Sequence, residues 1–253
     1  MSEQEQRLKA LLTGQKFEDS DELFQKLEES KELARSYAVV SNGIAVLSDF
    51  YENASYIYSG QFGRTLGIDD FSKDTNSSFE CEIFNKIPPE ELLERHILEL
   101  RFYRFLEANS IKDKSDYKMV SFVHFNQGNG SRIPVLHCTR YIQILPGGSV
   151  WLGLCTYVPF VDIPEGIEGC IVNQRTGESI QSEQYKQYDC QLLSARQLEV
   201  LSLLAKGEGS KQIAEQLCIS VNTVSRHRQN ILTQLNVTNT AAAVKIGLRM
   251  HLI

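Results

Sequence analysis

The sequence lacks the features that mark membrane, fibrous and secreted chains. It has no uninterrupted apolar run of the roughly 18 residues that a membrane helix needs, and its N-terminus MSEQEQRLKALLTG lacks the apolar core of a secretion signal. Only 6 Pro and 16 Gly occur in 253 residues, which excludes a collagen-like or low-complexity chain. We therefore expect a soluble, cytoplasmic protein that does not bind membranes.

Cysteine is scarce and scattered. The six cysteines form no CxxC pair and most lie among apolar residues, so we expect reduced, buried thiols and no metal site. No nucleophile elbow, phosphate-binding glycine loop or dinucleotide fingerprint is present. The sequence therefore predicts no enzyme, and it names no cofactor.

Length and charge divide the chain into an acidic and a basic part. A chain of 253 residues is comfortable for two domains. Residues 1–189 carry 19 basic and 29 acidic side chains, whereas residues 190–253 carry 7 and 3. The net charges are therefore −10 and +4, and a nucleic-acid partner is expected at the C-terminal part.

Caps and periodicity divide the C-terminal part into four short helices. Ser194 and Gln197 form a capping box that begins a helix over 195–206, ended by glycine. Ser210, Ser220 and Thr240 are expected to cap the next three helices, the last ending near residue 252. Only about three residues separate the second helix from the third, as in a helix-turn-helix.

The third of these helices has two distinct faces. Its apolar stripe predicts a core contact and consists of Val221, Val224, Ile231 and Leu235. Its opposite face is rich in hydrogen-bonding groups and consists of Asn222, Arg226, Gln229, Asn230 and Thr233. Such a face predicts a recognition helix for the DNA major groove.

These segments resemble, in order and spacing, the DNA-binding domain of the LuxR/GerE family. The resemblance rests on SARQLEVLSLLAKG, SKQIAEQL, ISVNTVSRHRQNI, QLNV and NTAAAVKIG. It implies Arg226 as the chief base reader, able to bridge two guanine acceptors, with Gln229 as a second contact. The full set of expected DNA-binding residues is Lys211, Asn222, Thr223, Ser225, Arg226, Arg228, Gln229 and Asn230.

Within this set, Arg228 is expected to lay its stem on the core and to reach a phosphate, and Lys211 to contact the backbone. Solvated side chains are the alternative for both. Lysines that are frequent in the family are absent at Ser225, Gln229 and Gln234, so each monomer makes fewer phosphate contacts. We therefore expect a homodimer on duplex DNA, and the family often dimerises through its fourth helix. His227 is assigned to packing and a local hydrogen bond.

The N-terminal part mixes helices and strands. Residues 1–36 look helical, either as a pairing helix or as a packed one. Strands are expected over 37–50 and 54–60, then a short helix ended by Gly67 and an amphipathic helix beginning at Pro88. Three further strands over 119–125, 133–145 and 150–160 form a meander, with turns at 127–130 and 146–148.

This order resembles a PAS fold, notably in YIYSGQFGRTLGID and IPPEELL. The segments ERHILELRFYRFLE and VWLGLCTY resemble PAS-plus-LuxR-type regulators of Bacteroides and its relatives. The fold class is α+β: a PAS-like antiparallel sheet with helices and a C-terminal all-α four-helix domain. We expect a helical segment at 1–36 and a sensor or dimerisation domain at 37–160. A linker with a hairpin near 175–178 follows at 161–189, and the DNA-binding domain occupies 190–253.

Several titratable residues invite other interpretations. His96 lies where some haem-binding PAS domains hold iron, but Glu94, Arg95 and Glu99 around it favour a solvated face. His124 and His137 alternate with apolar residues and are expected to be satisfied structural histidines. The pair Asp69 and Asp70 lacks the βα repeats of a receiver domain, so control by aspartyl phosphorylation is rejected.

The predicted function is a sequence-specific DNA-binding transcriptional regulator. Its PAS-like domain is expected either to sense a small molecule of unknown identity or to dimerise. The alternative is a sensor or scaffold whose C-terminal helices bind protein rather than DNA. Basic residues on the exposed face of the third helix favour DNA.

Overall fold

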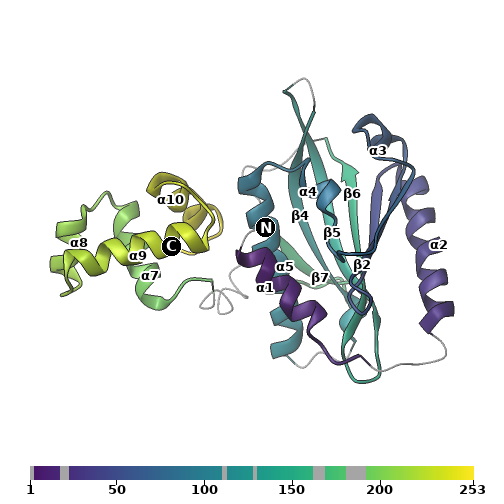
Figure 1. Ribbon diagram of the computed structural model, residues 1–253, viewed down its shortest axis with the longest axis horizontal. Helices are drawn as coiled ribbons and strands as arrows, with labels where there is room; N and C mark the ends of the chain where they lie inside the picture. The colour runs from purple at the N-terminus through teal and green to yellow at the C-terminus, as the bar shows by residue number, and fades with distance from the viewer. Residues whose placement is uncertain (1–2, 18–22, 110–112, 128–129, 162–168, 181–191) are drawn as a thin grey trace.

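The computed structural model describes residues 3–17, 23–109, 113–127, 130–161, 169–180 and 192–253. They form an α+β molecule with a sheet lobe and a smaller lobe of four helices (Figure 1). The sheet is antiparallel, with the strand order β3-β2-β1-β6-β5-β4-β7-β8. Its strands are β1 (Ile44–Asp49), β2 (Ala54–Ser59), β3 (Phe71–Asp74), β4 (Tyr117–Asn126), β5 (Arg132–Ile144), β6 (Val150–Pro159), β7 (Cys170–Asn173) and β8 (Ser179–Ile180).

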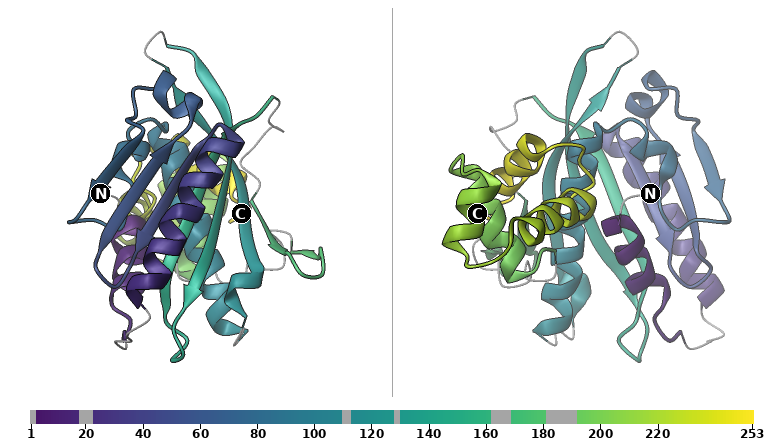
Figure 2. Two further views of the ribbon diagram at one scale, coloured as in Figure 1. Left: turned by 90° about the vertical axis from the view of Figure 1, so that its right-hand side faces the viewer. Right: turned by 60° about the vertical axis from the view of Figure 1, so that its left-hand side comes forward.

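Helices cover both faces of the sheet (Figures 1 and 2). One face is covered by α2 (Leu23–Ser41), which buries Ala34 and Ala38 beside Trp151. The other face carries α1 (Glu3–Thr13), α3 (Gln61–Thr65), α4 (Cys81–Phe84) and α5 (Pro89–Ala108), and a 3₁₀ turn, Lys114–Asp116, leads into β4. Among the described helices, none combines the length and apolar character that crossing a membrane requires.

Four helices form the C-terminal lobe. They are α7 (Ala195–Ala205), α8 (Ser210–Gln216), α9 (Val221–Gln234) and α10 (Thr240–Arg249). Val200 and Leu201 of α7, Ile213 of α8, Val224 of α9 and Ile246 of α10 are all buried. The apolar face of α10 packs on α7, whereas Leu248 is 54% exposed.

The strand and turn predictions hold for the meander and fail at two places. Residues 37–41 belong to the last turns of α2, where Ala38 faces the sheet and is buried. The strand begins only at Ile44. The hairpin near 175–178 is real, but its first strand, β7, pairs with β4 and so extends the sheet into the expected linker. Residues 128–129 of the expected turn and the polar run after 180 lie outside the described residues.

The long helix α5 is not amphipathic. Glu94, Arg95, His96 and Glu99 were expected on a solvated face, but each is at most 3% exposed. The helix is covered on one side by the sheet, on another by α1, and at Glu94 and Arg101 by α10. Of the five cysteines in the described ranges, Cys155 is buried, as expected, whereas Cys138 and Cys170 are half-buried and Cys81 and Cys218 are exposed.

The two lobes touch through α1 and α5 on one side and α9 and α10 on the other (Figure 2). Arg249 Nη2 lies 2.9 Å from Glu94 Oε2, and Arg101 donates to the carbonyl of Met250 at 3.1 Å. Gln4 Nε2 donates to the carbonyl of Gln234 at 3.3 Å. Glu94 is fully buried, and neither of its oxygens accepts a well-aligned hydrogen bond from a described residue. Burial, partly opposed by Arg249, raises the pKa of Glu94 from 4.5 to about 7.

Glu94 should make stability depend on pH. An acid whose pKa is higher in the folded state binds a proton more readily when folded. The folded state is therefore favoured at low pH, and this contribution to the free energy of unfolding is lost as the pH rises through the folded-state pKa. We predict that the free energy of unfolding falls as pH rises from about 5 to about 8. Glu94→Gln should reduce this fall, by up to roughly 3 kcal/mol. Chemical denaturation of both proteins across this range measures the difference, and parallel pH profiles would contradict the prediction.

Candidate functional site

The helix α9, expected to be the recognition helix, begins where the sequence predicts. Ser220 is its N-cap and accepts a hydrogen bond from the backbone N–H of Thr223 at 3.0 Å. Val224, Ile231 and Leu235 form the buried stripe, each at most 1% exposed. Val221, expected in that stripe, is 41% exposed and is the first residue of the helix.

The turn between α8 and α9 is tight. Cys218 adopts a left-handed backbone with φ of 52°, and the N–H of Ile219 returns to the carbonyl of Ala214 at 3.0 Å. This closure ends α8 as in a helix C-cap motif and turns the chain directly into the cap of α9. The result is a helix-turn-helix in which α8 packs on α9.

Two of the expected caps are wrong by one residue. Gly209, not Ser210, is the N-cap of α8, and its N–H donates to Gln212 Oε1 at 2.7 Å. Asn239, not Thr240, caps α10 and accepts from the N–H of Ala242 at 2.9 Å. The capping box of Ser194 and Gln197 is confirmed on α7. Ser210 and Thr240 are thereby left with hydroxyls free for another partner.

That partner is Arg228. Its guanidinium donates to Ser210 Oγ at 2.8 Å and to Thr240 Oγ1 at 2.9 Å. Arg228 therefore connects α9 to the starts of α8 and α10, and its expected phosphate contact stays a prediction. Its stem lies on the core edge as expected, since the residue is half-buried. One side chain fixes the relative position of three helices.

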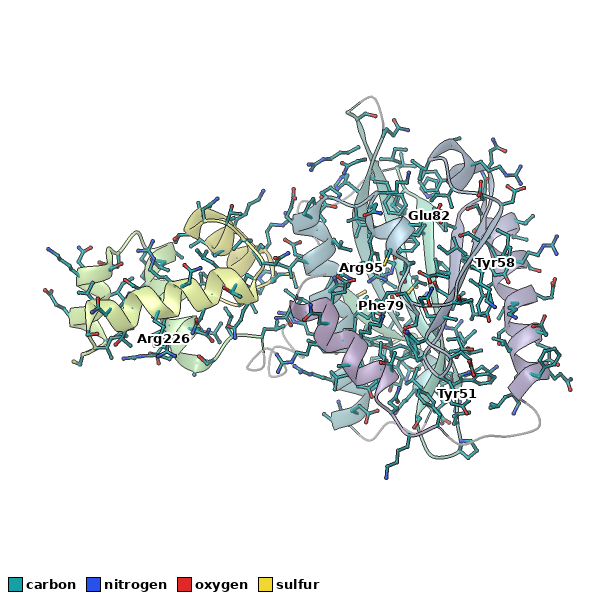
Figure 3. The ribbon with its side chains drawn as sticks, in the orientation of Figure 1. Tyr51, Tyr58, Phe79, Glu82, Arg95 and Arg226 are labelled. Carbon is teal, nitrogen blue, oxygen red and sulfur yellow. The ribbon has the colours of Figure 1, made fainter. Side chains whose placement is uncertain are left out.

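The remaining predicted DNA-binding residues gather on the solvent side of α9. Asn222, Ser225, Arg226, Gln229 and Asn230 are all exposed, and Lys211 is exposed in the first turn of α8. Arg226 projects from α9 away from the sheet lobe (Figure 3). Thr223 is half-buried, and its hydroxyl lies 2.9 Å from Ser220 Oγ in the cap. His227 is half-buried, in keeping with a packing role.

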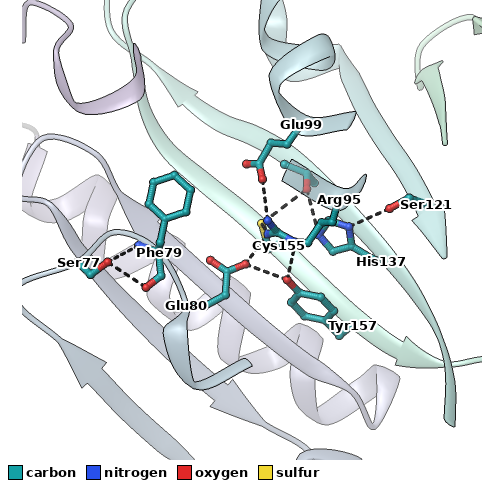
Figure 4. A network of polar contacts seen from close by, with 10 residues as sticks. Ser77, Phe79, Glu80, Arg95, Glu99, Ser121, His137, Cys155 and Tyr157 are labelled. Carbon is teal, nitrogen blue, oxygen red and sulfur yellow. Dashed lines mark hydrogen bonds and ion pairs between the residues drawn. The ribbon is translucent and has the colours of Figure 1, made fainter. Parts of the chain in front are cut away.

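A second polar assembly is buried in the sheet lobe (Figure 4). Arg95 of α5 donates to Glu80 Oε1 at 2.6 Å and to Glu99 Oε2 at 3.0 Å. The Tyr157 hydroxyl also donates to Glu80 Oε1, at 2.9 Å, and accepts from Arg95 Nε at 3.1 Å. We call Glu80, Arg95, Glu99 and Tyr157 the buried network. All four residues are at most 3% exposed.

The buried network holds more carboxylate than guanidinium. Burial raises the pKa of Glu99 to about 7, although Arg95 opposes that rise. Next to it, His137 lies 3.0 Å from Ser121 Oγ and 3.2 Å from Thr139 Oγ1, which agrees with a satisfied structural histidine. His124 likewise pairs with Glu91, with its Nδ1 3.0 Å from Oε1. Burial lowers the pKa of both His137 and His96.

His96 differs from these two histidines. Its ring meets Phe84 edge-on at 4.9 Å between centroids, and neither ring nitrogen has a hydrogen-bond partner among the described residues. The sequence did not predict the buried network, because the charged residues Glu94, Arg95 and Glu99 indicate a solvent-exposed helix face. The spacing of Arg95 and Glu99 by one helical turn was the available signal.

A pocket of about 300 Å³ opens beside the buried network. Glu80 forms part of its lining, and so does Ser55, whose hydroxyl is fully buried and has no partner among the described residues. Phe79 and Glu82 lie on the same side of the sheet (Figure 3). The pocket thus joins solvent to the charged interior of this lobe.

These geometries define the class of the C-terminal domain, a tetra-helical helix-turn-helix domain whose α9 has an exposed polar face. More particularly, residues 191–246 match the family model of bacterial regulatory proteins, luxR family. This C-terminal domain is of the LuxR type.

Individual proteins resemble the chain over different shares of its length. The oxygen regulatory protein NreC of Staphylococcus epidermidis is 39% identical over 84 residues, which are 33% of this chain and 38% of the relative. The chain thus spans 38% of the length of that relative. Two solved structures span more of the chain at lower similarity. Vibrio cholerae VqmA is 15% identical over 90% of this chain and 88% of its own, with a TM-score of 0.32. Escherichia coli SdiA is 17% identical over 98% of both chains, with a TM-score of 0.26.

Removing Arg228 should destabilise the C-terminal lobe. Arg228→Met keeps an aliphatic stem but loses two charge-assisted hydrogen bonds, each worth about 1.5–3 kcal/mol when formed. Because the residue is partly exposed, we expect a net loss of about 1–3 kcal/mol in urea denaturation followed by circular dichroism. The matched control Arg226→Met lies on the open face and should change stability by less than about 0.5 kcal/mol. Equal effects of the two variants would contradict the internal role of Arg228.

Proposed function

We propose that the chain is a sequence-specific DNA-binding transcriptional regulator. The observation that carries this proposal is the free polar face of α9. Arg226 makes no hydrogen bond or ion pair with a described residue, and Asn222, Gln229 and Asn230 are exposed beside it. Side chains of these types can bridge the acceptors and donors of base edges in the major groove. Arg226 is the leading base reader, Gln229 is the second, and Ser225 and Thr223 are their neighbours.

Phosphate contacts are proposed for Lys211 and for the polar ends of α8 and α9. Because Arg228 is engaged inside the domain, α9 offers Arg226 as its exposed arginine. A recognition helix with so few cations gains little from counterion release. We therefore propose that two copies bind two half-sites, which doubles the contacts and supports adequate affinity.

The helix α2 supports such pairing. Leu33, Tyr37 and Val40 lie at helical spacing on its outer side and are 56%, 41% and 87% exposed. Apolar residues at i, i+4 and i+7 form one stripe, and a stripe left in water favours association. We propose that a second copy of the chain covers it. The helix α1 is already packed on α5, with Leu8 and Leu12 fully buried, so it is the less suitable surface.

The sheet lobe is proposed as a PAS-like sensor. Its support is the pocket that reaches Glu80, because Glu80 is bonded to Arg95 on α5, and α5 also carries the contacts with α10. A small molecule in this pocket can alter the buried network and thereby the position of α5. The contacts of Glu94 and Arg101 with the end of α10 would then transmit that change to the C-terminal lobe.

The test of DNA reading uses sequences selected from a random duplex library by the full chain. Arg226→Ala should abolish discrimination between the selected and scrambled duplexes, because each bidentate contact contributes about 1–3 kcal/mol of base discrimination. Nonspecific binding at low salt should persist. Fluorescence anisotropy measures both affinities, and Lys206→Ala, which removes an exposed cation at the end of α7, is the control. Unchanged discrimination in Arg226→Ala, or failure of the library to enrich any sequence, would favour a protein-binding role.

The proposed α2 interface has its own test. Val40→Glu places a charge in the apolar stripe on an almost fully exposed side chain, so it should leave the fold intact and weaken self-association at least tenfold. Sedimentation equilibrium of the full chain measures the change. Gln25→Glu, on the same helix two turns before Leu33 and roughly 80° around the helix from it, should leave association unchanged. A dimer that tolerates Val40→Glu would locate the interface elsewhere.

A further inference from the structure

A cleft of about 600 Å³ lies between α2 and the β2–β3 edge of the sheet. It is on the sheet face opposite α4 and α5, and Tyr58 lies between β2 and α2 there (Figure 3). The lining includes Lys31 and Val39 of α2, Tyr56 and Tyr58 of β2, and Phe71 and Lys73 of β3. This cleft is therefore separate from the pocket at Glu80 and from the contacts that α1 and α5 make with the C-terminal lobe.

The strand register collects four of these side chains on one face. Tyr56 pairs with Lys73 and Tyr58 pairs with Phe71 across β2 and β3. Directly opposed residues of antiparallel strands project to the same side, so two rings of β2 stand beside a ring and an ammonium group of β3. The rings of Tyr58 and Phe71 are 5.2 Å apart, and Lys73 Nζ is 5.2 Å from the centre of Tyr56.

The cleft carries an excess of positive charge in an otherwise acidic lobe. Of its four cations, Lys31 pairs with Glu28 at 2.6 Å, Arg35 with Glu32 at 3.9 Å, and Arg64 with Asp70. Lys73 has no carboxylate partner within the described ranges. Four cations and three carboxylates leave a net charge of +1. A cationic ligand is therefore disfavoured and a monoanion is favoured.

The cleft also offers a buried donor. Tyr58 is 8% exposed, and its hydroxyl makes no hydrogen bond with a described residue. Burial, and then the charges of Glu28 and Glu32, raise the pKa of Tyr58 to about 12. The hydroxyl therefore keeps its proton at neutral pH and can donate. Phe71 and Val39, 52% and 66% exposed, add an apolar rim.

We propose that this cleft binds a small aromatic carboxylate. Lys73 Nζ neutralises the carboxylate, the Tyr58 hydroxyl donates to it, and the ring of the ligand lies against Tyr58 and Phe71. The volume falls within the roughly 300–1,000 Å³ of sites for small molecules. Donors without an acceptor partner, apolar rings and a single unpaired cation together match this chemistry. The site does not depend on DNA binding, and it goes beyond the sensor role proposed for the other pocket.

Isothermal titration of the full chain with three probes tests the proposal. Benzoate should bind at least about tenfold more tightly than its neutral analogue benzamide, and benzylammonium should not bind. Lys73→Met should reduce benzoate affinity to that of benzamide. Tyr58→Phe, which keeps the ring, should weaken benzoate about tenfold, as expected for one hydrogen bond to a charged group. Lys16→Met, an exposed cation outside the cleft, is the matched control.

Three results would overturn the proposal. They are absence of benzoate binding to the native chain, equal binding of benzoate and benzamide, and unchanged benzoate affinity in Lys73→Met. Circular dichroism of each variant shows whether the fold is retained. Should Tyr58→Phe fold poorly, Lys73→Met alone decides, since its side chain is partly exposed and makes no ion pair within the described part of the chain.

Discussion

The rest of the structure depends on the burial of one charged side chain, Arg95, in the middle of α5. A guanidinium removed from water is stable only when carboxylates and other acceptors surround it. Glu80 and Glu99 supply these, and Tyr157 holds Glu80 from β6. The requirement ties the loop before α4, the helix α5 and the centre of the sheet to a single arrangement, because removing Arg95 would leave two buried carboxylates without a cation.

The same helix determines where the C-terminal lobe lies. Arg95 and Glu99 fix the inner side of α5 against the sheet, while Glu94 and Arg101 present its outer side to α10. The contacts involve the C-terminal part of α9 and the end of α10, so the exposed polar side of α9, which carries Arg226, stays open. The proposed sensor and reader thus share one rigid element. DNA can approach Arg226 without displacing the sheet lobe.

Local rules predicted the C-terminal domain well because its signals are local. The caps, the apolar stripe and the polar face of each helix lie within a few residues of one another in the sequence. The errors at Gly209 and Asn239 moved a helix start by only one position. The role of Arg228 was missed because its acceptors, Ser210 and Thr240, lie 18 and 12 residues away. In the sheet lobe, strands and turns were readable, yet α5 was misread. A charged sequence normally indicates a solvated face, and only tertiary contacts with β6, α1 and α10 reveal that these charges are buried. The PAS-like assignment and the DNA-binding roles stay predictions.

Hydrogen exchange of the full chain, measured with and without a duplex that it has selected, tests the central claim most directly. We predict that the backbone amides of residues 222–230 exchange more slowly when DNA is bound. A DNA complex in which α9 exchanges as fast as in the free protein would contradict it.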